Sequence, residues 1–222
     1  MLVKFCGATT CAEVEDMAEA GADLVGLWHE VPGGRADLTL NQLTALSAAA
    51  RAAGLSPVMV TFSRDPRTLL SAVEAARVPW IQLHGFQTPG VVRALRERGP
   101  DSLKIAKVLH VNGATCLEGR LTAAYERAGA DCFLIDAVAD DGRVGSTART
   151  LDDATVTDLA DRVRLPFLLA GGLRADNRAA FPRATAHPRF LGADVDSAAR
   201  AADGLLHAGR AAAIAAAWRM AA

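Results

Sequence analysis

One feature restricts the fold of this chain more than any other: a short apolar run followed by a longer amphipathic stretch, repeated eight times. The apolar runs are nearly continuous, which is typical of strands that are buried on both faces of a parallel sheet. We expect strands at residues 2–6, 24–28, 57–62, 80–84, 103–109, 132–136, 167–170 and 190–195.

The stretches between these runs carry apolar residues at helical spacing, as Val14, Met17 and Ala18 do in the first. We expect helices at residues 12–20, 41–53, 66–77, 89–98, 114–128, 152–164, 176–184 and 204–220. Strand then helix, eight times over, favours a (β/α)8 TIM barrel or a doubly wound sheet. The 222 residues match the roughly 200–250 of one barrel, so we expect a single barrel domain spanning residues 1–222.

A short internal repeat favours the barrel over the open sheet. The sequence GADLVGL, from Gly21, opens the second expected strand, and GADCFLI, from Gly129, opens the sixth. Four strands are half a turn of an eight-stranded barrel. The shared residues Gly-Ala-Asp also form a common helix-to-strand link in which Gly ends the helix. The sequence leaves open whether the repeat reflects barrel symmetry or only this link.

Charge and cysteine content narrow the class of partner. A net charge of −1 without a basic cluster argues against nucleic acid and membrane surfaces and favours a small-molecule partner. The N-terminus does not resemble a signal peptide, and no apolar run reaches about 18 residues, so we expect a cytoplasmic protein. The four cysteines lack zinc-ligand spacing, so we expect no metal, although one thiol could be catalytic.

Four motifs fall where expected strands end, which is the active face of a (β/α)8 barrel. They are KFCGAT at residues 4–9, QLHG at 82–85, LID at 134–136 and LAGGL at 169–173. In these motifs, in their order and in their spacing along essentially the whole chain, the sequence resembles the phosphoribosylanthranilate isomerase family of tryptophan biosynthesis.

The resemblance implies an isomerase of the aldose–ketose type that catalyses an Amadori rearrangement. An N-ribosyl aryl amine becomes a 1-arylamino-1-deoxyribulose, with one acid at the furanose ring oxygen and one base at C2′. It implies no metal or organic cofactor and a substrate with an aryl carboxylate. A monomer and a homodimer are equally compatible with it.

The resemblance also assigns the site residues. Cys6 corresponds to the general base, and its thiol must lose a proton near neutral pH; Asp136 corresponds to the general acid, which burial would keep protonated. Arg35 corresponds to the arginine that faces the aryl carboxylate, for which a guanidinium fork is suited. The remaining substrate-binding candidates are Lys4, His84, Gly171, Gly172, Asp196 and Ser197.

The eighth strand departs from the family pattern. Where the family has a phosphate-binding serine and glycine, this chain has Asp196 and Ala198, and residues 145–148 of the sixth loop also differ. A carboxylate about 4 Å from a phosphate charge costs roughly 4 kcal/mol at an effective dielectric near 20. Asp196 is therefore expected to exclude phosphate, unless it instead caps the following helix.

Three functions stay open from the sequence. The chain is a working isomerase with a tolerant eighth loop, a paralogue in secondary metabolism with a different and unphosphorylated substrate, or a non-catalytic small-molecule-binding barrel. The presence of both Cys6 and Asp136 argues against the last, because a pure binder does not need an acid/base pair.

Overall fold

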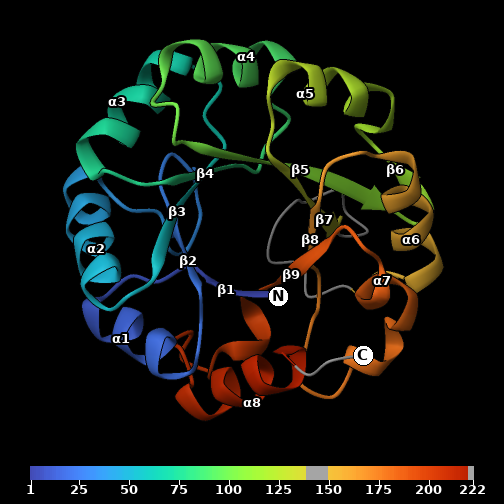
Figure 1. The fold of residues 1–222 in the computed structure, drawn as a ribbon. Coiled ribbons are helices and arrows are strands. Elements are labelled where there is room, and N and C mark those ends of the chain that lie inside the picture. The colour runs from blue at the N-terminus through green and yellow to red at the C-terminus, as the bar shows by residue number, and fades with distance from the viewer. Residues whose placement is uncertain (139–149, 220–222) are drawn as a thin grey trace.

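The computed structural model describes residues 1–138 and 150–219, and within them eight parallel strands close into a barrel (Figure 1). Pairing of the first strand with the last, and of the fourth with the fifth, completes the ring. The strands are β1 (Leu2–Cys6), β2 (Leu24–Trp28), β3 (Ser56–Thr61), β4 (Trp80–Leu83), β5 (Lys104–Asn112), β7 (Cys132–Ala137), β8 (Phe167–Leu169) and β9 (Phe190–Val195). The fold is thus a (β/α)8 TIM barrel, as expected, and not a doubly wound sheet.

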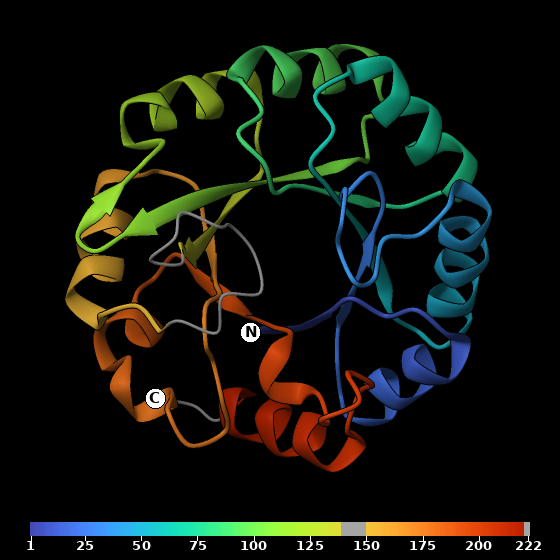
Figure 2. The same ribbon diagram turned by 180° about the vertical axis from the view of Figure 1, so that it is seen from behind.

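Helices surround the strands as an outer ring, which Figure 2 shows from behind. The main core lies between this ring and the sheet, where Val14 and Met17 of the first helix pack with Val3 and Phe5 of the first strand. The helices are α1 (Cys11–Glu19), α2 (Leu40–Ala52), α3 (Pro66–Ala76), α4 (Pro89–Arg98), α5 (Thr122–Ala128), α6 (Asp153–Arg162), α7 (Pro182–Ala186) and α8 (Ala208–Arg219). Within the described ranges no helix has the length and apolar content of a membrane span.

The helix expected at residues 114–128 is wrong in its first half. Strand β5 turns back at Gly113 into β6 (Thr115–Cys116), which pairs antiparallel with it. A 3-10 turn, η1 (Gly119–Leu121), follows before α5 begins. Gly113 has φ +57°, a left-handed conformation that glycine adopts readily, so the Asn112-Gly113 dipeptide specifies a turn here.

The helix expected at residues 176–184 is also wrong: a 3-10 turn, η2 (Arg178–Ala180), precedes the short α7. The side chain of Asn177 accepts a hydrogen bond from the Arg174 backbone (2.7 Å) and donates one to the Gly172 carbonyl (3.0 Å). These bonds hold a turn, and Pro182 then favours a new helix start. The last helix starts at Ala208 rather than at residue 204, because the chain first forms a bridge between Arg200 and Leu206.

Alternate residues of each strand point into the barrel. Two small apolar clusters form there, separate from the main core: Cys6, Leu24, Val58 and Val60 in one, and Val108, Leu134, Leu168 and Ala170 in the other. Two residues beyond Val108 and Leu134 come His110 and Asp136, which are register partners on neighbouring strands. The interior thus changes from apolar to polar toward the strands' carboxyl ends.

The internal repeat marks a repeated structural role. Asp23 and Asp131 each accept a hydrogen bond from the backbone of the preceding barrel strand, at Val3 (2.8 Å) and Ile105 (2.7 Å). Each carboxylate also pairs with an arginine, Arg219 in one case and Arg96 in the other. The repeat therefore ties the strands together at two opposite points of the barrel.

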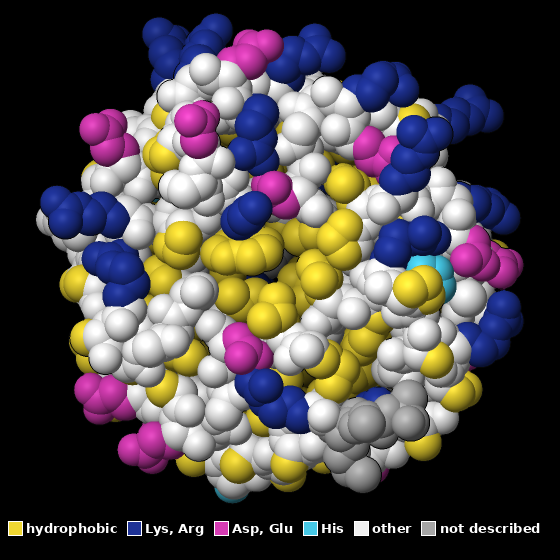
Figure 3. All heavy atoms as spheres, viewed as in Figure 1, with side chains coloured by type: hydrophobic (Ala, Val, Ile, Leu, Met, Phe, Trp, Pro, Cys, Tyr) yellow, Lys and Arg dark blue, Asp and Glu magenta, His cyan; other side chains and the backbone are white. Residues whose placement is uncertain are grey.

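In Figure 3, Lys and Arg side chains surround the visible face, and apolar side chains fill its middle.

Candidate active site

The thiol of Cys6 lies at the end of β1 between two nitrogen donors. Lys4 Nζ is 3.3 Å from Cys6 Sγ, and the indole N–H of Trp28, at the end of β2, donates to the same sulfur at 3.1 Å. Lys4 also bonds both carboxylate oxygens of Asp194 at 2.8 Å, across the register pair of β1 and β9. One cationic donor and one neutral donor are thus held where a thiolate would form.

The closeness of these groups depends on Gly26 in the middle of β2. A Cβ at this position would lie 2.5 Å from Cys6 Sγ and 3.1 Å from Lys4 Nζ. A side chain there would displace the thiol or the ammonium group. Gly26 belongs to the site through the space it leaves, a role that the sequence motifs do not indicate.

Burial dominates the acidity of the Cys6 thiol. It raises the pKa to about 11, although the neighbouring Lys4 ammonium acts in the opposite direction. Burial therefore opposes the loss of this proton near neutral pH, which the role of a general base requires. The physical reason is that a closed, apolar barrel interior disfavours the thiolate more than one ammonium group stabilises it.

Asp136 lies at the end of β7 and is 5% exposed. Burial raises the pKa of its carboxyl to about 7, and the negative charge of Asp194 adds to the effect. The backbone N–H of Ala137 donates to Oδ1 at 2.9 Å, and His84 Nε2 is 3.6 Å from Oδ2. The carboxyl is thus suited to carry a proton at neutral pH, in the direction expected from the sequence.

His84 contacts the carboxyl of Asp136 but is not a cation. Burial lowers the pKa of its imidazole well below the ordinary value, so the ring is neutral near pH 7. Its Nδ1 is 2.9 Å from the Gln82 side-chain amide, and its ring stacks on Phe62 at 5.5 Å between centroids. The structure therefore places His84 beside the expected acid as a neutral hydrogen-bonding group.

Arg35 lies in the loop after β2, with its guanidinium over the Trp28 ring at 5.1 Å from the centroid. It forms an ion pair with Asp196, in the loop after β9. The same Asp196 oxygen accepts from Arg200 Nε at 2.6 Å, and Arg200 in turn pairs with Glu13 at 2.8 Å. Two guanidinium groups and two carboxylates form one network across the barrel mouth.

Asp196 is therefore a paired carboxylate and not an isolated one. An unpaired carboxylate would exclude phosphate electrostatically, whereas the charges of this network sum to zero. The alternative expectation, that Asp196 caps the next helix, is wrong: no side-chain capping bond joins it to η3 (Ser197–Ala199). The guanidinium groups of Arg35 and Arg200 bind this carboxylate instead.

Arg200 is a residue of this region that the motifs did not indicate. Besides Asp196 and Glu13, its guanidinium donates to the carbonyl oxygens of Cys6 (2.6 Å) and Gly7 (2.8 Å). It is 6% exposed and fixes the backbone that follows the thiol. Asp196 and Arg200 stand four residues apart, but they flank a 3-10 turn and not an α-helix, so the helical spacing rule could not indicate their pairing.

The glycines after β8 adopt the conformations for which glycine is needed. Gly171 has φ +87° and Gly172 φ +60°, so a side chain at either position would be strained. Ser197 is exposed and begins η3. Residues 145–148, which also depart from the family pattern, lie outside the described residues.

His110 and Glu118 form a second pair that the sequence analysis missed. His110 is the inward-facing residue near the end of β5, and its Nδ1 is 2.6 Å from Glu118 Oε1. Its ring is 5.7 Å from that of His84, nearly at right angles. The alternation of inward residues along residues 104–112 could have indicated His110, but the antiparallel turn that delivers Glu118 was not expected.

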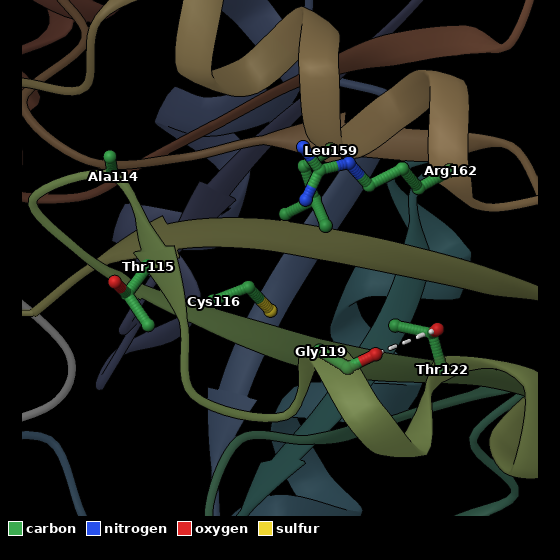
Figure 4. A pocket seen from close by; sticks show the side chains of 7 residues that line it. All are labelled: Ala114, Thr115, Cys116, Gly119, Thr122, Leu159 and Arg162. Carbon is green, nitrogen blue, oxygen red and sulfur yellow. Dashed lines mark hydrogen bonds between the residues drawn. The ribbon is translucent and has the colours of Figure 1, made fainter.

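A pocket lies on the outer side of the segment that carries Glu118, facing α6 (Figure 4). Cys116 and Arg162 are among its lining residues, and the others are Ala114, Thr115, Gly119, Thr122 and Leu159. None of the expected site residues lines it. The chemistry at the barrel mouth is therefore separate from this pocket.

Comparison with known proteins agrees with this geometry. The family model described as N-(5′-phosphoribosyl)anthranilate (PRA) isomerase matches residues 3–205. The enzyme of that name from Azorhizobium caulinodans is 37% identical over 205 residues, covering 91% of this chain and 85% of the relative. Its counterpart from Halorubrum lacusprofundi is 35% identical over 206 residues, covering 91% and 89%.

Solved structures show the same fold. TrpF from Jonesia denitrificans superposes with a TM-score of 0.73 at 26% identity, covering 98% of this chain and 96% of that one. Phosphoribosyl anthranilate isomerase from Thermus thermophilus gives a TM-score of 0.78 at 23% identity, with 98% of both chains covered. The chain belongs to the N-(5′-phosphoribosyl)anthranilate isomerase family.

Proposed function

We propose that this chain is a phosphoribosylanthranilate isomerase of tryptophan biosynthesis, acting in the cytoplasm on a small-molecule substrate. The observation that carries the proposal is the placement of a buried thiol, Cys6, and a buried carboxyl of raised pKa, Asp136, at strand ends inside a barrel of this family. A solved member of the family is in complex with reduced 1-(o-carboxyphenylamino)-1-deoxyribulose 5-phosphate, which is the reduced form of the product that an Amadori rearrangement would give.

Asp136 supplies the acid in this mechanism. With a pKa of about 7, a large share of its carboxyl groups hold a proton at neutral pH, in contrast to an ordinary aspartic acid. The proton goes to the furanose ring oxygen, the bond between that oxygen and C1′ breaks, and a Schiff base forms. The backbone N–H of Ala137 orients the carboxyl by donating to Oδ1 at 2.9 Å, and the neutral His84 lies 3.6 Å from Oδ2.

Cys6 supplies the base, and it must be a thiolate when it takes the proton from C2′. Because its pKa is about 11 while that of Asp136 is about 7, the reactive combination, thiolate with carboxylic acid, is a small fraction of the molecules at any pH. The donors Lys4 Nζ and Trp28 Nε1 stabilise that fraction. An enzyme of this kind tolerates the small fraction because a thiolate of high pKa is a strong base.

Arg35 receives the aryl carboxylate. Its side chain is 38% exposed and its guanidinium lies over the Trp28 ring, and the indole N–H of that ring donates to the Cys6 sulfur. A substrate carboxylate on Arg35 would thus set the aryl amine near the thiol. It would compete with Asp196 for the same guanidinium.

The phosphate would bind beside Gly171, Gly172 and Ser197. Pairing with Arg35 and Arg200 removes most of the repulsion that a bare Asp196 would exert. Relatives named as PRA isomerases over about nine tenths of the chain favour the phosphorylated substrate over an unphosphorylated one.

Growth of a tryptophan auxotroph that lacks this isomerase tests the proposal. We expect the parent gene to restore growth without tryptophan, and Cys6→Ser and Asp136→Asn to fail at equal protein levels. Cys11→Ser is the matched control, because Cys11 is an exposed thiol outside the barrel interior, and it should rescue like the parent. Failure of the parent gene at normal expression would overturn the proposal.

A further inference from the structure

His110 occupies the same layer of the barrel as the acid and the base. It is the register partner of Asp136 on the adjacent strand and lies in ring contact with His84. Its side chain is fully buried, and its Nε2 has no hydrogen-bond partner among the described residues. A buried imidazole nitrogen without a partner is costly, and a catalytic role is one reason for which a fold retains such a group.

Glu118 fixes the orientation and the tautomer of this imidazole. One carboxylate oxygen lies 2.6 Å from His110 Nδ1, and the other accepts from the His110 backbone N–H at 2.9 Å. Although burial acts to raise it, the pKa of Glu118 is lowered overall by the hydrogen bond from His110 and by the charge of Lys107. An ionised Glu118 can only accept, so Nδ1 must carry a hydrogen, and the neutral form of this imidazole then has its lone pair on Nε2.

The chain delivers Glu118 to this position through the β5–β6 hairpin. In Figure 4, Cys116 and Gly119 on either side of it line the outer pocket that faces α6. Glu118 itself points the other way and is 4% exposed. A histidine oriented by a carboxylate, with its second nitrogen unpaired at a barrel mouth, is the arrangement that general acid/base catalysis uses.

We propose that His110 is a further catalytic residue of this site, which accepts the C2′ hydroxyl proton when the enolamine intermediate becomes the ketone, and that Glu118 is its positioning residue. This inference rests on the proposed isomerase function. It concerns the last chemical step, whereas the roles of Cys6 and Asp136 concern the earlier ones.

The proton transfers of this step balance. Before it, Asp136 has given its proton to the ring oxygen and Cys6 holds the proton taken from C2′. His110 Nε2 then takes the hydroxyl proton, the oxygen forms a double bond to C2′, and the C1′–C2′ double bond opens to take the thiol proton at C1′. Cys6 is again a thiolate, and the His110 imidazolium returns a proton to Asp136 on the adjacent strand.

The stereochemistry at C1′ tests the inference. A substrate with deuterium at C1′ gives a CHD group in the product, whose configuration can be read by NMR after rapid trapping with borohydride. If His110 and Cys6 act together on the bound enolamine, the parent gives one configuration. His110→Gln should release the enolamine to ketonise in solution, and the excess of one configuration should fall to none.

Two further variants make this result specific. Glu118→Gln leaves the imidazole in place without its carboxylate and should reduce the excess. His187→Gln is the matched control, because His187 also lies near a carboxylate (Asp161, 3.3 Å) and an aromatic ring (Phe167), but outside the barrel interior; it should match the parent.

Two results overturn the inference while leaving the isomerase function intact: product of both configurations from the parent, or of one configuration from His110→Gln. The parent measurement does not depend on the folding of any variant. If the parent forms no product, the proposed function fails and this inference fails with it.

Discussion

Cys6 and Asp136 are buried to nearly the same extent, 7% and 5% exposed, yet burial serves one role and opposes the other. It keeps the carboxyl protonated, as an acid needs, and it also keeps the thiol protonated, as a base does not. Lys4 Nζ and Trp28 Nε1, which lie beside the sulfur, stabilise the thiolate against this effect of burial. Their contribution to the acidity of the thiol can be measured without following the reaction.

Replacement of Asp136 should reveal the cost of its burial. A carboxyl with a pKa of about 7 in the fold against 3.8 ordinarily holds its proton more tightly in the folded than in the unfolded state, so stability falls as pH rises from about 4 to 7 and is level above that. Asp136→Asn removes the effect. We expect urea unfolding at pH 8 to show the variant more stable by up to about 4 kcal/mol, with no gain at pH 4. An equal difference at both pH values would contradict the burial of an ionisable Asp136.

The thiol of Cys6 should react as a group of high pKa. With iodoacetamide, the rate at Cys6, followed by mass spectrometry of its peptide, should rise about tenfold per pH unit between pH 7 and 9, because the thiolate fraction does. Trp28→Phe keeps an aromatic ring but removes the N–H donor, and should slow alkylation at every pH. A rate that levels off below pH 9 would show a thiol pKa well below about 11.

The sequence was sufficient to place Cys6, Asp136 and Arg35 at strand ends and in the loop between them, because family motifs mark those positions. It could not give the acidity of Cys6, which depends on how completely the closed barrel excludes water. Nor could it give the Arg200–Asp196–Arg35 network, in which Arg35 and Asp196 lie 161 residues apart. Long-range pairing of this kind follows from the closed ring and not from local pattern.

The loops after β2 and β9 are joined across the mouth by Arg35 and Asp196. Substrate binding must loosen this link if Arg35 takes the aryl carboxylate. We expect Asp196→Asn, which keeps the shape without the charge, to lower KM for phosphoribosylanthranilate several-fold with little change in kcat. Arg35→Lys should raise KM because the two-point fork is lost. Steady-state kinetics decide this, and a higher KM for Asp196→Asn would mean that the ion pair helps to build the site.

Strands were more predictable than the segments between them. All eight barrel strands appear near their expected positions, since continuous apolar runs carry a strong signal. The hairpin at Gly113 and the turn held by Asn177 were missed, because helical apolar spacing continues through both segments while a single glycine or a side-chain hydrogen bond decides the backbone. The first of these segments carries Glu118, and Asn177 of the second bonds the carbonyl of Gly172.

The barrel as a whole is secured away from its active face by the paired roles of Asp23 and Asp131. Each buries part of a carboxylate against a strand backbone, and neither contacts the site residues. We expect Asp131→Ala to reduce the free energy of unfolding by about 1–3 kcal/mol, and Asp23→Ala to do the same, while kcat of the folded protein stays within about twofold. Loss of turnover without loss of stability would show that this face takes part in catalysis.

The central claim is that the thiol and the carboxyl at the barrel mouth carry out an Amadori rearrangement. The most direct test is the conversion of phosphoribosylanthranilate by the purified chain, with the product identified as 1-(o-carboxyphenylamino)-1-deoxyribulose 5-phosphate. We expect steady turnover by the parent and a fall in kcat of about 100-fold or more for Cys6→Ser and for Asp136→Asn, the scale of losing a positioned base or acid. No conversion by the folded parent, or turnover by Cys6→Ser within a few-fold of the parent, would contradict it.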